Sequence, residues 1–228
     1  KEADVSRRNT FSLPEYRRLM VTLKSYTSVK ECPDDKERLE RMLFQDAILL
    51  ASNTLCRVGE LFSLRWKDIE NIVKKLDETG QEVSVATIFV RGETSKVGRS
   101  RRFVCRGGEY LERLRSKTSF TDPEDFVFSA VGSGLPPKKS FWYSHWKTIM
   151  GFMGMPDYKE KKITFYSLRH FGITCRIRAK VDIFELAQAA GTSQMHITNT
   201  YGHWDESMLQ DVALKNFTLS VDGITYKD

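Results

Sequence analysis

The stretch GTSQMHITNTYGH, residues 191–203, says more about this chain than any other segment of it. It places Tyr201 nine residues after Thr192, within a helix that the sequence predicts over residues 193–202. A tyrosine hydroxyl is a nucleophile that can form a covalent intermediate. The ordinary alternative is a buried aromatic side chain on a helix. The spacing alone leaves both interpretations open.

Two upstream segments each carry an arginine that fits the same chemistry. TLCRVGELFSLRW (54–66) contains Arg57 and, three residues later, Glu60, and YSLRHFGIT (166–174) contains Arg169. A guanidinium presents a planar fork of donors that matches a phosphate, and it keeps its charge near neutral pH. Two such forks and a late tyrosine are what transesterification of a phosphodiester requires. Taken singly, each arginine could instead belong to a surface ion pair.

Positive charge is concentrated in one part of the sequence. The chain has a net charge of +6 and a pI near 9.1. The segment from Arg91 to Lys117 holds nine basic residues and three glutamates, so it alone carries the whole excess. A localised basic stretch suits the binding of a polyanion. A solvated loop and helix face is the alternative.

Several classes of protein are disfavoured by composition. The sequence contains no apolar run long enough for a membrane span and no signal-peptide pattern. The four cysteines are scattered without metal-type spacing, which predicts reduced thiols in a cytoplasmic protein and no metal site. The chain begins with Lys1 rather than Met, so we expect a fragment.

Periodicity and capping residues predict a mostly helical α+β domain. Helices are predicted over residues 12–24, 38–53, 60–66, 109–117, 138–153, 163–179, 182–190, 193–202 and 205–216. Strands are predicted over 83–90 and 102–105, and together they form a basic antiparallel β-hairpin whose turn contains Lys96. We expect residues 1–9 to be frayed and residues 1–228 to form a single domain.

These motifs, taken in order, resemble the catalytic domain of the tyrosine recombinase, or phage integrase, family. The resemblance covers roughly residues 10–215. The matching segments are the family's Arg-x-x-Glu at 57–60 with Leu-x-x-Leu-x-Trp at 61–66, its hairpin lysine at Lys96, its His-x-x-Arg-His at 166–170, and its Leu-Gly-His nine residues before a tyrosine at 190–192 and Tyr201. Each motif alone is weak, whereas four in the family's order are specific.

The resemblance implies a role for each of the four principal residues. Arg57 and Arg169 would clamp the scissile phosphate and stabilise its transition state. Tyr201 would attack phosphorus and leave a 3′-phosphotyrosyl link. Lys96 would protonate the leaving 5′ oxygen. For Lys96 the alternative is an exposed turn lysine that contacts the DNA backbone.

Supporting roles follow for the neighbouring residues. Glu60 would orient Arg57 or His170 through a hydrogen bond, although an ordinary glutamate at a helix start is the alternative. His170 is expected to support the pocket beside Arg169 as a structural histidine rather than a proton donor. The resemblance also assigns phosphates that flank the cut to a set of hairpin arginines, namely Arg99, Arg101, Arg102 and Arg106.

Two positions depart from the family's pattern. Tyr166 stands where the family has the first histidine of His-x-x-Arg, and Thr192 stands where it has histidine or tryptophan. Those family residues position or protonate groups around the phosphate. Each hydroxyl here can still donate a hydrogen bond. The departure therefore concerns proton handling more than phosphate binding.

We therefore expect the catalytic domain of a site-specific DNA recombinase from a phage or other mobile element, without the family's N-terminal DNA-binding domain. A catalytically weakened DNA-binding protein of the same fold and a type IB topoisomerase are the alternatives. The resemblance implies double-stranded DNA as partner, a homotetramer on DNA with residues 205–228 exchanged between subunits, and a monomer as the isolated domain. It implies no cofactor, no metal and no membrane, in the cytoplasm of a bacterial, archaeal or host cell.

Overall fold

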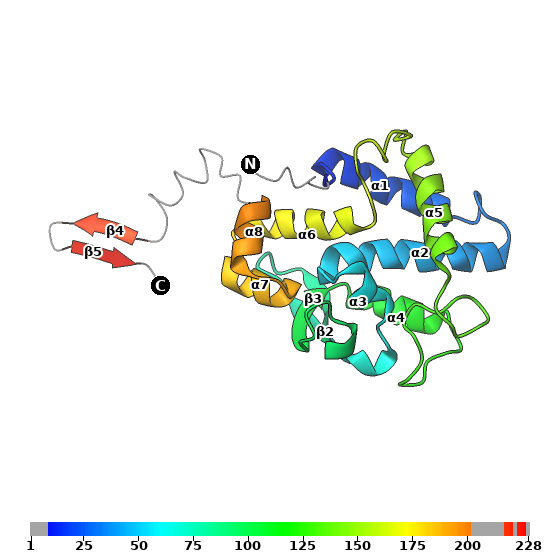
Figure 1. Cartoon of the computed structure of the whole chain (residues 1–228), viewed down its shortest axis with the longest axis horizontal. Helices are drawn as coiled ribbons and strands as arrows, with labels where there is room; N and C mark the ends of the chain where they lie inside the picture. Colours follow the sequence, from blue (N-terminus) through cyan, green and yellow to red (C-terminus); the bar gives the residue numbers. More distant parts are fainter. Residues whose placement is uncertain (1–8, 202–216, 221–222, 227–228) are drawn as a thin grey trace.

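The computed structural model describes residues 9–201, 217–220 and 223–226. Within them the elements are α1 (Leu13–Tyr26), α2 (Asp35–Thr54), α3 (Val58–Phe62), η1 (Trp66–Asp68), β1 (Ile69–Leu76), β2 (Glu82–Val90), η2 (Gly92–Thr94), β3 (Arg101–Arg106), α4 (Gly108–Ser116), α5 (Lys139–Phe152), α6 (Tyr166–Arg178), α7 (Ile183–Ala190), α8 (Gln194–Tyr201), β4 (Phe217–Ser220) and β5 (Gly223–Tyr226) (Figure 1). The predicted class, mostly helical with a small antiparallel sheet, is confirmed. The helix predicted over 205–216 and most of the frayed N-terminus lie outside the described residues.

Helix α2 forms the centre of the domain. Its side chains Phe44, Ala47, Ile48 and Leu50 are buried and belong to the main hydrophobic cluster. It packs against α4, α5, α6 and β3, and Figure 1 shows α6 along one side of it and α4 along the other. The Asp34 side chain caps its N-terminus by accepting the Glu37 N–H at 2.7 Å. The C-terminal end of α2 therefore has a fixed position inside the fold.

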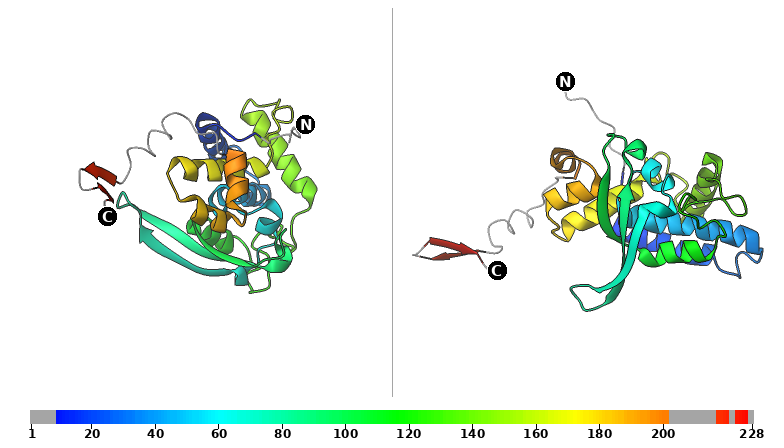
Figure 2. Two further views of the ribbon diagram at one scale, coloured as in Figure 1. Left: turned by 60° about the vertical axis from the view of Figure 1, so that its left-hand side comes forward. Right: turned by 90° about the horizontal axis from the view of Figure 1, so that it is seen from below.

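The sheet contains one strand more than the sequence predicted. The order is β1-β2-β3, antiparallel throughout, and Val90 of β2 lies opposite Arg101 of β3. Strands β2 and β3 match the predicted hairpin, whereas β1 was missed. Its burial pattern does not alternate cleanly, because it lies at the edge of the sheet and leaves several polar residues in solvent. Figure 2 shows the β1–β2 end of the sheet projecting from the helical body.

Several predicted helices have different bounds in the structure, including α2, which starts at Asp35 rather than at residue 38. The helix predicted over 60–66 stops at Phe62, and a separate 3-10 turn starts at Trp66, where Asp68 accepts the Arg65 N–H at 2.9 Å. The helix predicted over 163–179 starts at Tyr166.

Among the described helices, none is long and apolar enough to cross a membrane. The β4–β5 pair, antiparallel from Phe217↔Tyr226 to Ser220↔Gly223, was not predicted.

Helices α2 and α6 approach each other so closely that only glycine fits between them. A Cβ built on Gly172 would lie 2.2 Å from the main-chain oxygen of Ser52 and 2.7 Å from Leu55 Cδ2. One turn further on, Arg176 donates to the Asn53 oxygen at 2.8 Å and so satisfies a carbonyl at the end of α2. The contact therefore fixes how closely α6 approaches α2. It also fixes where the N-terminal turns of α6 lie.

We expect Gly172→Ala to lower the free energy of unfolding by about 1–3 kcal/mol, because a methyl group would be forced against main-chain atoms. Helix propensity opposes this, since alanine in a helix is favoured over glycine by about 1 kcal/mol. Gly151→Ala on α5 is the matched control, since a Cβ there meets nothing within 4 Å. Urea denaturation of both variants checks the prediction, and equal stability of the two would contradict the close-contact argument.

Candidate active site

The α2–α3 junction places Arg57. Leu55, the C-cap of α2, has a left-handed backbone conformation with φ 54° although it carries a side chain. The chain turns there, and Arg57 becomes the N-cap of α3. Its Nη2 donates to the main-chain oxygen of Gly191 at 2.9 Å. This contact joins two segments that are 134 residues apart in sequence.

Glu60 holds Arg57 from the other side and is itself shared with Arg101. Its carboxylate accepts the Arg57 main-chain N–H and Nη1, both at 2.9 Å. The same carboxylate accepts Arg101 Nη2 at 2.7 Å and Nη1 at 3.2 Å. Burial alone would raise the pKa of Glu60, but the hydrogen bonds from Arg101 and Arg57 outweigh it and hold this pKa below the ordinary value. Glu60 is therefore a carboxylate at neutral pH, bridging two guanidiniums.

Strand β3 separates the arginines that the sequence grouped together. Arg101 lies on the inner face of the strand, with 12 % of its side chain exposed, so its guanidinium joins the Glu60 cluster. Arg102 lies on the outer face and pairs with Glu70 at 2.6 Å. Arg106 is also exposed and pairs with Asp77 at 3.1 Å, and Arg99 is exposed in the loop before the strand. Arg101 therefore binds a buried carboxylate, whereas the other three arginines of this set are exposed.

We expect Arg101→Ala to lower the free energy of unfolding by about 3–5 kcal/mol, because a buried carboxylate would lose one of its two cationic partners. Its neighbour supplies a matched control. Arg102→Ala removes an exposed ion pair and is expected to change stability little. Guanidinium or urea unfolding measures both. A similar small effect for the two variants would mean that Arg101 does not hold Glu60 in place.

Arg169 enters the same region from α6. Its residue is 3 % exposed, and its Nη1 donates to the main-chain oxygen of Leu55. Burial lowers the pKa of Arg169 and the charge of Arg57 adds to this, whereas Tyr166, Tyr201 and Glu60 oppose it. A guanidinium keeps its proton under such shifts. The interactions with Arg57, Glu60 and Tyr201 place all four residues in one neighbourhood.

The Tyr201 hydroxyl lies within this neighbourhood and contacts His170. Its Oη is 2.5 Å from His170 Nδ1, and the two ring centroids are 5.4 Å apart. The ring of Tyr166 packs edge-on against His170 at 4.9 Å. Burial raises the pKa of the Tyr201 phenol; Arg169 opposes the shift and Tyr166 adds to it. His170 thus contacts the predicted nucleophile, which sequence reasoning did not foresee.

The turn after α7 contributes main-chain atoms rather than a side chain. Gly191 caps α7 with φ 61°, and a Cβ on it would lie 2.6 Å from the Arg101 guanidinium carbon. Only glycine meets both demands. Thr192 is half-buried, and its N–H donates to the Ala187 oxygen at 3.0 Å. The sequence pointed to this pair through its spacing from Tyr201 but did not reveal the role of Gly191.

Lys96 lies in the loop between β2 and β3 and is exposed. No hydrogen bond or ion pair joins its ammonium group to another residue in the described part of the chain, so the structure does not bring Lys96 into the arginine cluster. Its turn is defined: the Gly98 N–H donates to the Ser95 oxygen at 3.0 Å, and Gly98 has φ 66°. The loop therefore presents Lys96 in an exposed turn.

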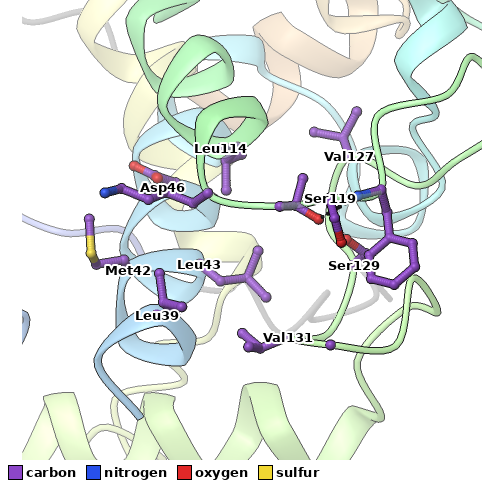
Figure 3. Close-up of a pocket in the computed structure, with 13 residues that line it drawn as sticks. Leu39, Met42, Leu43, Asp46, Leu114, Ser119, Val127, Ser129 and Val131 are labelled. Carbon is purple, nitrogen blue, oxygen red and sulfur yellow. Dashed lines mark hydrogen bonds between the residues drawn. The ribbon is translucent and has the colours of Figure 1, made fainter. Parts of the chain in front are cut away.

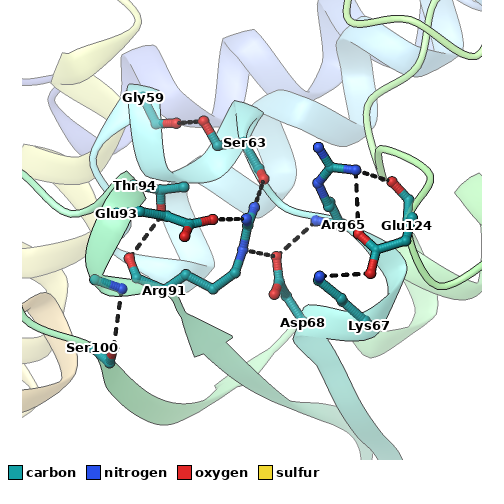
Figure 4. A network of polar contacts seen from close by, with 11 residues as sticks. Gly59, Ser63, Arg65, Lys67, Asp68, Arg91, Glu93, Thr94, Ser100 and Glu124 are labelled. Carbon is teal, nitrogen blue, oxygen red and sulfur yellow. Dashed lines mark hydrogen bonds and ion pairs between the residues drawn. The ribbon is translucent and has the colours of Figure 1, made fainter.

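The base of that loop is tied to the helix that carries Arg57. Arg91 donates to Asp68 at 3.1 Å and to the Ser63 main-chain oxygen at 2.7 Å, and it also pairs with Glu93 (Figure 4). Ser100 closes the loop by accepting the Gly92 N–H at 3.0 Å. Ser63 follows α3 directly, and Arg57 caps the start of the same helix. The base of the loop and Arg57 are therefore both attached to α3.

The cluster has an excess of positive charge. Arg57, Arg101 and Arg169 contribute three guanidiniums, and Glu60 contributes one carboxylate within bonding distance of two of them. A cluster with more cations than anions makes a site that favours an incoming anion. The forks also provide donors in the geometry that phosphate accepts. The arrangement is suited to bind a phosphodiester next to a phenolic hydroxyl.

A pocket of about 120 Å³ lies elsewhere and takes no part in this site. Figure 3 shows it between Leu39 and Leu43 of α2 and Val131 of the loop that follows α4. Asp46, its lining residue nearest the end of α2, is roughly 14 Å along the helix axis from Leu55. A binding surface for duplex DNA has no need of an enclosed cavity. Among the described residues no group of three or more His, Cys, Asp or Glu could hold a metal ion.

The sequence matches the model of the phage integrase family over residues 14–208. The chain belongs to the phage integrase family. No sequence match was found among proteins of curated function. The family assignment confirms the resemblance drawn from the motifs at Arg57, Arg169 and Tyr201.

Solved structures of integrase-family recombinases have the same fold. XerH site-specific recombinase in a post-cleavage complex with its palindromic difH substrate has a TM-score of 0.64 at 17 % identity, covering 93 % of this chain and 55 % of that one. XerA recombinase has a TM-score of 0.58 at 20 % identity, covering 93 % and 65 %. A lambda integrase dimer bound to a core site has 0.51 at 15 %, covering 88 % and 51 %. This chain therefore spans about half to two thirds of the length of these integrase-family structures.

Proposed function

We propose that this integrase-family chain is the catalytic domain of a site-specific DNA recombinase that cuts one strand through Tyr201 and rejoins it to a partner strand. One observation carries the proposal. Arg57 of α3, Arg169 of α6 and Tyr201 of α8, which are far apart in sequence, lie in one neighbourhood. A single phosphodiester can meet both forks and the phenol there.

The chemistry follows from the groups present. The Tyr201 oxygen attacks phosphorus, the bond to the 5′ oxygen breaks, and the 3′ end remains attached to the protein as a phosphotyrosine. Arg57 and Arg169 stabilise the additional negative charge of the pentacoordinate transition state. Because the phosphodiester energy is kept in the covalent link, the reverse attack by a 5′ hydroxyl needs no nucleotide cofactor.

Other residues assist in defined ways. Glu60 and Arg101 position Arg57, and the hydroxyls of Tyr166 and Thr192 donate to phosphate oxygens. Lys96, at the tip of the β2–β3 loop, protonates the leaving 5′ oxygen once DNA fills the site. The loop's anchored base and exposed tip support this role, since the tip can meet the DNA while the base stays with α3.

Duplex DNA is the proposed partner. The XerH and lambda integrase structures described above are bound to a difH substrate and to a core site. The exposed arginines of the sheet, Arg99, Arg102 and Arg106, would contact phosphates that flank the cut. We propose that residues 1–228 form one catalytic domain that assembles as a homotetramer on DNA through residues 205–228, is a monomer alone, and acts in the cytoplasm of its host cell.

A selection that needs no knowledge of the target tests the proposal. The protein is incubated with a pool of duplexes that carry a randomised core and a nick near its centre, so that the released 5′ fragment diffuses away. Covalent complexes are isolated under denaturing conditions, and the attached DNA is sequenced. Recovery of a common motif joined to Tyr201 supports a recombinase. Absence of any covalent product contradicts it.

Tyr166 and Thr192 favour a second candidate, a DNA-binding protein of this fold that no longer cuts. That protein would bind duplexes with strong salt dependence and form no adduct. A type IB topoisomerase would instead relax supercoiled plasmids without needing a specific site. Plasmid relaxation run beside the selection separates these outcomes.

A further inference from the structure

The contact between Tyr201 and His170 is a close hydrogen bond in a sheltered setting. The distance from Oη to Nδ1 is 2.5 Å, and His170 is 9 % exposed. Tyr201 packs against the small hydrophobic cluster formed by Leu55, Ile173, Leu186, Ala187, Ala190 and Ile197. Because this packing fixes the ring, the hydroxyl points at the imidazole before any DNA is present.

Attack by Tyr201 requires that its proton be taken away. A phenol is neutral at physiological pH, and burial raises the pKa of Tyr201 further. The hydroxyls of Tyr166 and Thr192 are poor proton acceptors near neutral pH. Imidazole is the side chain whose basicity suits this task. Among the described residues, the imidazole that contacts the reacting oxygen belongs to His170.

We propose that His170 is a catalytic residue that accepts the Tyr201 proton at Nδ1 as the tyrosine attacks. The inference rests on the proposed function. The Tyr201 Oη–phosphorus bond forms as the phosphorus–O5′ bond breaks. One proton passes from Oη to Nδ1, and a second passes from Lys96 to O5′. In rejoining, the 5′ oxygen attacks phosphorus and gives its proton back to Lys96. The bond from phosphorus to Tyr201 Oη breaks, and Oη recovers its proton from His170.

The charges around His170 make this transfer depend on bound DNA. Among the described residues, the titratable and charged groups near it include Tyr166 and Arg169 of α6, Tyr201 of α8 and, beyond Arg169, Arg57 and Glu60. The two guanidiniums already give this neighbourhood a positive charge. An incoming phosphate supplies the negative charge that offsets them. The positive charge that His170 gains with the proton is therefore balanced by the bound phosphate.

The tautomer of His170 can be tested on the free protein, without DNA. Proton-coupled ¹⁵N spectra of histidine-labelled protein report which ring nitrogen carries hydrogen. We expect an unprotonated Nδ1 and a protonated Nε2 in the wild type at neutral pH, with a shift of the Nδ1 resonance in Tyr201→Phe. Hydrogen on Nδ1 at neutral pH would overturn the proposal, because that nitrogen could then accept no proton.

Kinetics on the selected nicked duplex supply the second test. His170→Asn keeps a hydrogen-bond acceptor near the Nδ1 position but cannot take up a proton. We expect it to slow single-turnover adduct formation about 100-fold and to remove the acid limb of the pH–rate profile, with duplex affinity unchanged. His196→Asn, on the exposed face of α8, is the matched control. Unchanged rate and pH profile in His170→Asn would overturn the proposal.

A substrate with a bridging sulfur at the 5′ position distinguishes the two proton transfers. A thiolate leaves without a proton, because thiols are far more acidic than alcohols. The sulfur should restore cleavage by Lys96→Ala but not by His170→Asn. Rescue of His170→Asn would contradict a role on the tyrosine side. If the wild type forms no adduct at all, the recombinase proposal itself fails, and the tautomer measurement still decides the ground-state contact.

Discussion

Replacing Tyr201 with phenylalanine is expected to abolish covalent attachment to DNA while leaving duplex binding almost unchanged. The substitution removes the reacting oxygen and keeps the ring that packs against the second hydrophobic cluster. The lost hydrogen bond to His170 should cost about 1 kcal/mol of stability. Denaturing electrophoresis of the protein with the selected nicked duplex measures attachment, and a gel-shift assay measures binding.

Two other tyrosines serve as controls for that experiment. Tyr143 is 72 % exposed on α5, so Tyr143→Phe should form the adduct at the wild-type rate. Tyr166 lies beside His170 and is the nearest rival nucleophile. Tyr166→Phe should slow the reaction without preventing it. An adduct that survives Tyr201→Phe and disappears in Tyr166→Phe would assign the nucleophile to α6.

Arg169→Ala should reduce cleavage by about three orders of magnitude, because a buried donor fork no longer meets the charge that develops on phosphate. Arg169→Lys should recover only part of this loss, since an ammonium is a point charge without the fork. Arg178→Ala, on the exposed last turn of the same helix, is the control and should react normally. Single-turnover rates at saturating protein measure all three variants.

The Arg169 series also tests the geometry of the site. If Arg169→Lys cleaved DNA as fast as the wild type, the proposal of a bidentate contact between Arg169 and the phosphate would be wrong. If alanine at this position affected only DNA affinity, Arg169 would bind the ground state and the transition state equally. Thermal unfolding controls for loss of the Leu55 contact, which the alanine variant also removes.

The sequence predicted the helices well because their capping and periodic signals are local. The Ser12 and Glu15 capping box at the start of α1 is an example, and both of its hydrogen bonds are present. Strand β1 was missed because an edge strand with charged residues has no strong local signal, and its pairing with β2 decides its conformation. The β4–β5 pair was missed as well.

The candidate site was predictable in its residues but less so in its contacts. Motif spacing singled out Arg57, Arg169 and Tyr201, and the structure brings them together. Motif spacing could not show that Arg101 faces inward, since that depends on the register of β3 with β2. A one-residue slip would exchange Arg101 with Arg102. The approach of His170 to Tyr201 depends on how α6 and α8 pack, which no local pattern encodes.

The left-handed turns at Leu55 and Gly191 have a shared consequence for mutational robustness. Each supplies the carbonyl that orients one of the two principal guanidiniums, Leu55 for Arg169 and Gly191 for Arg57. Both carbonyls stand at the negative ends of helices. Every amino acid carries that oxygen, so no codon change can delete the anchor. The sensitive property is instead the backbone torsion. A single proline or bulky residue at position 191 would shift the carbonyl that orients Arg57 without replacing any side chain that the reaction uses.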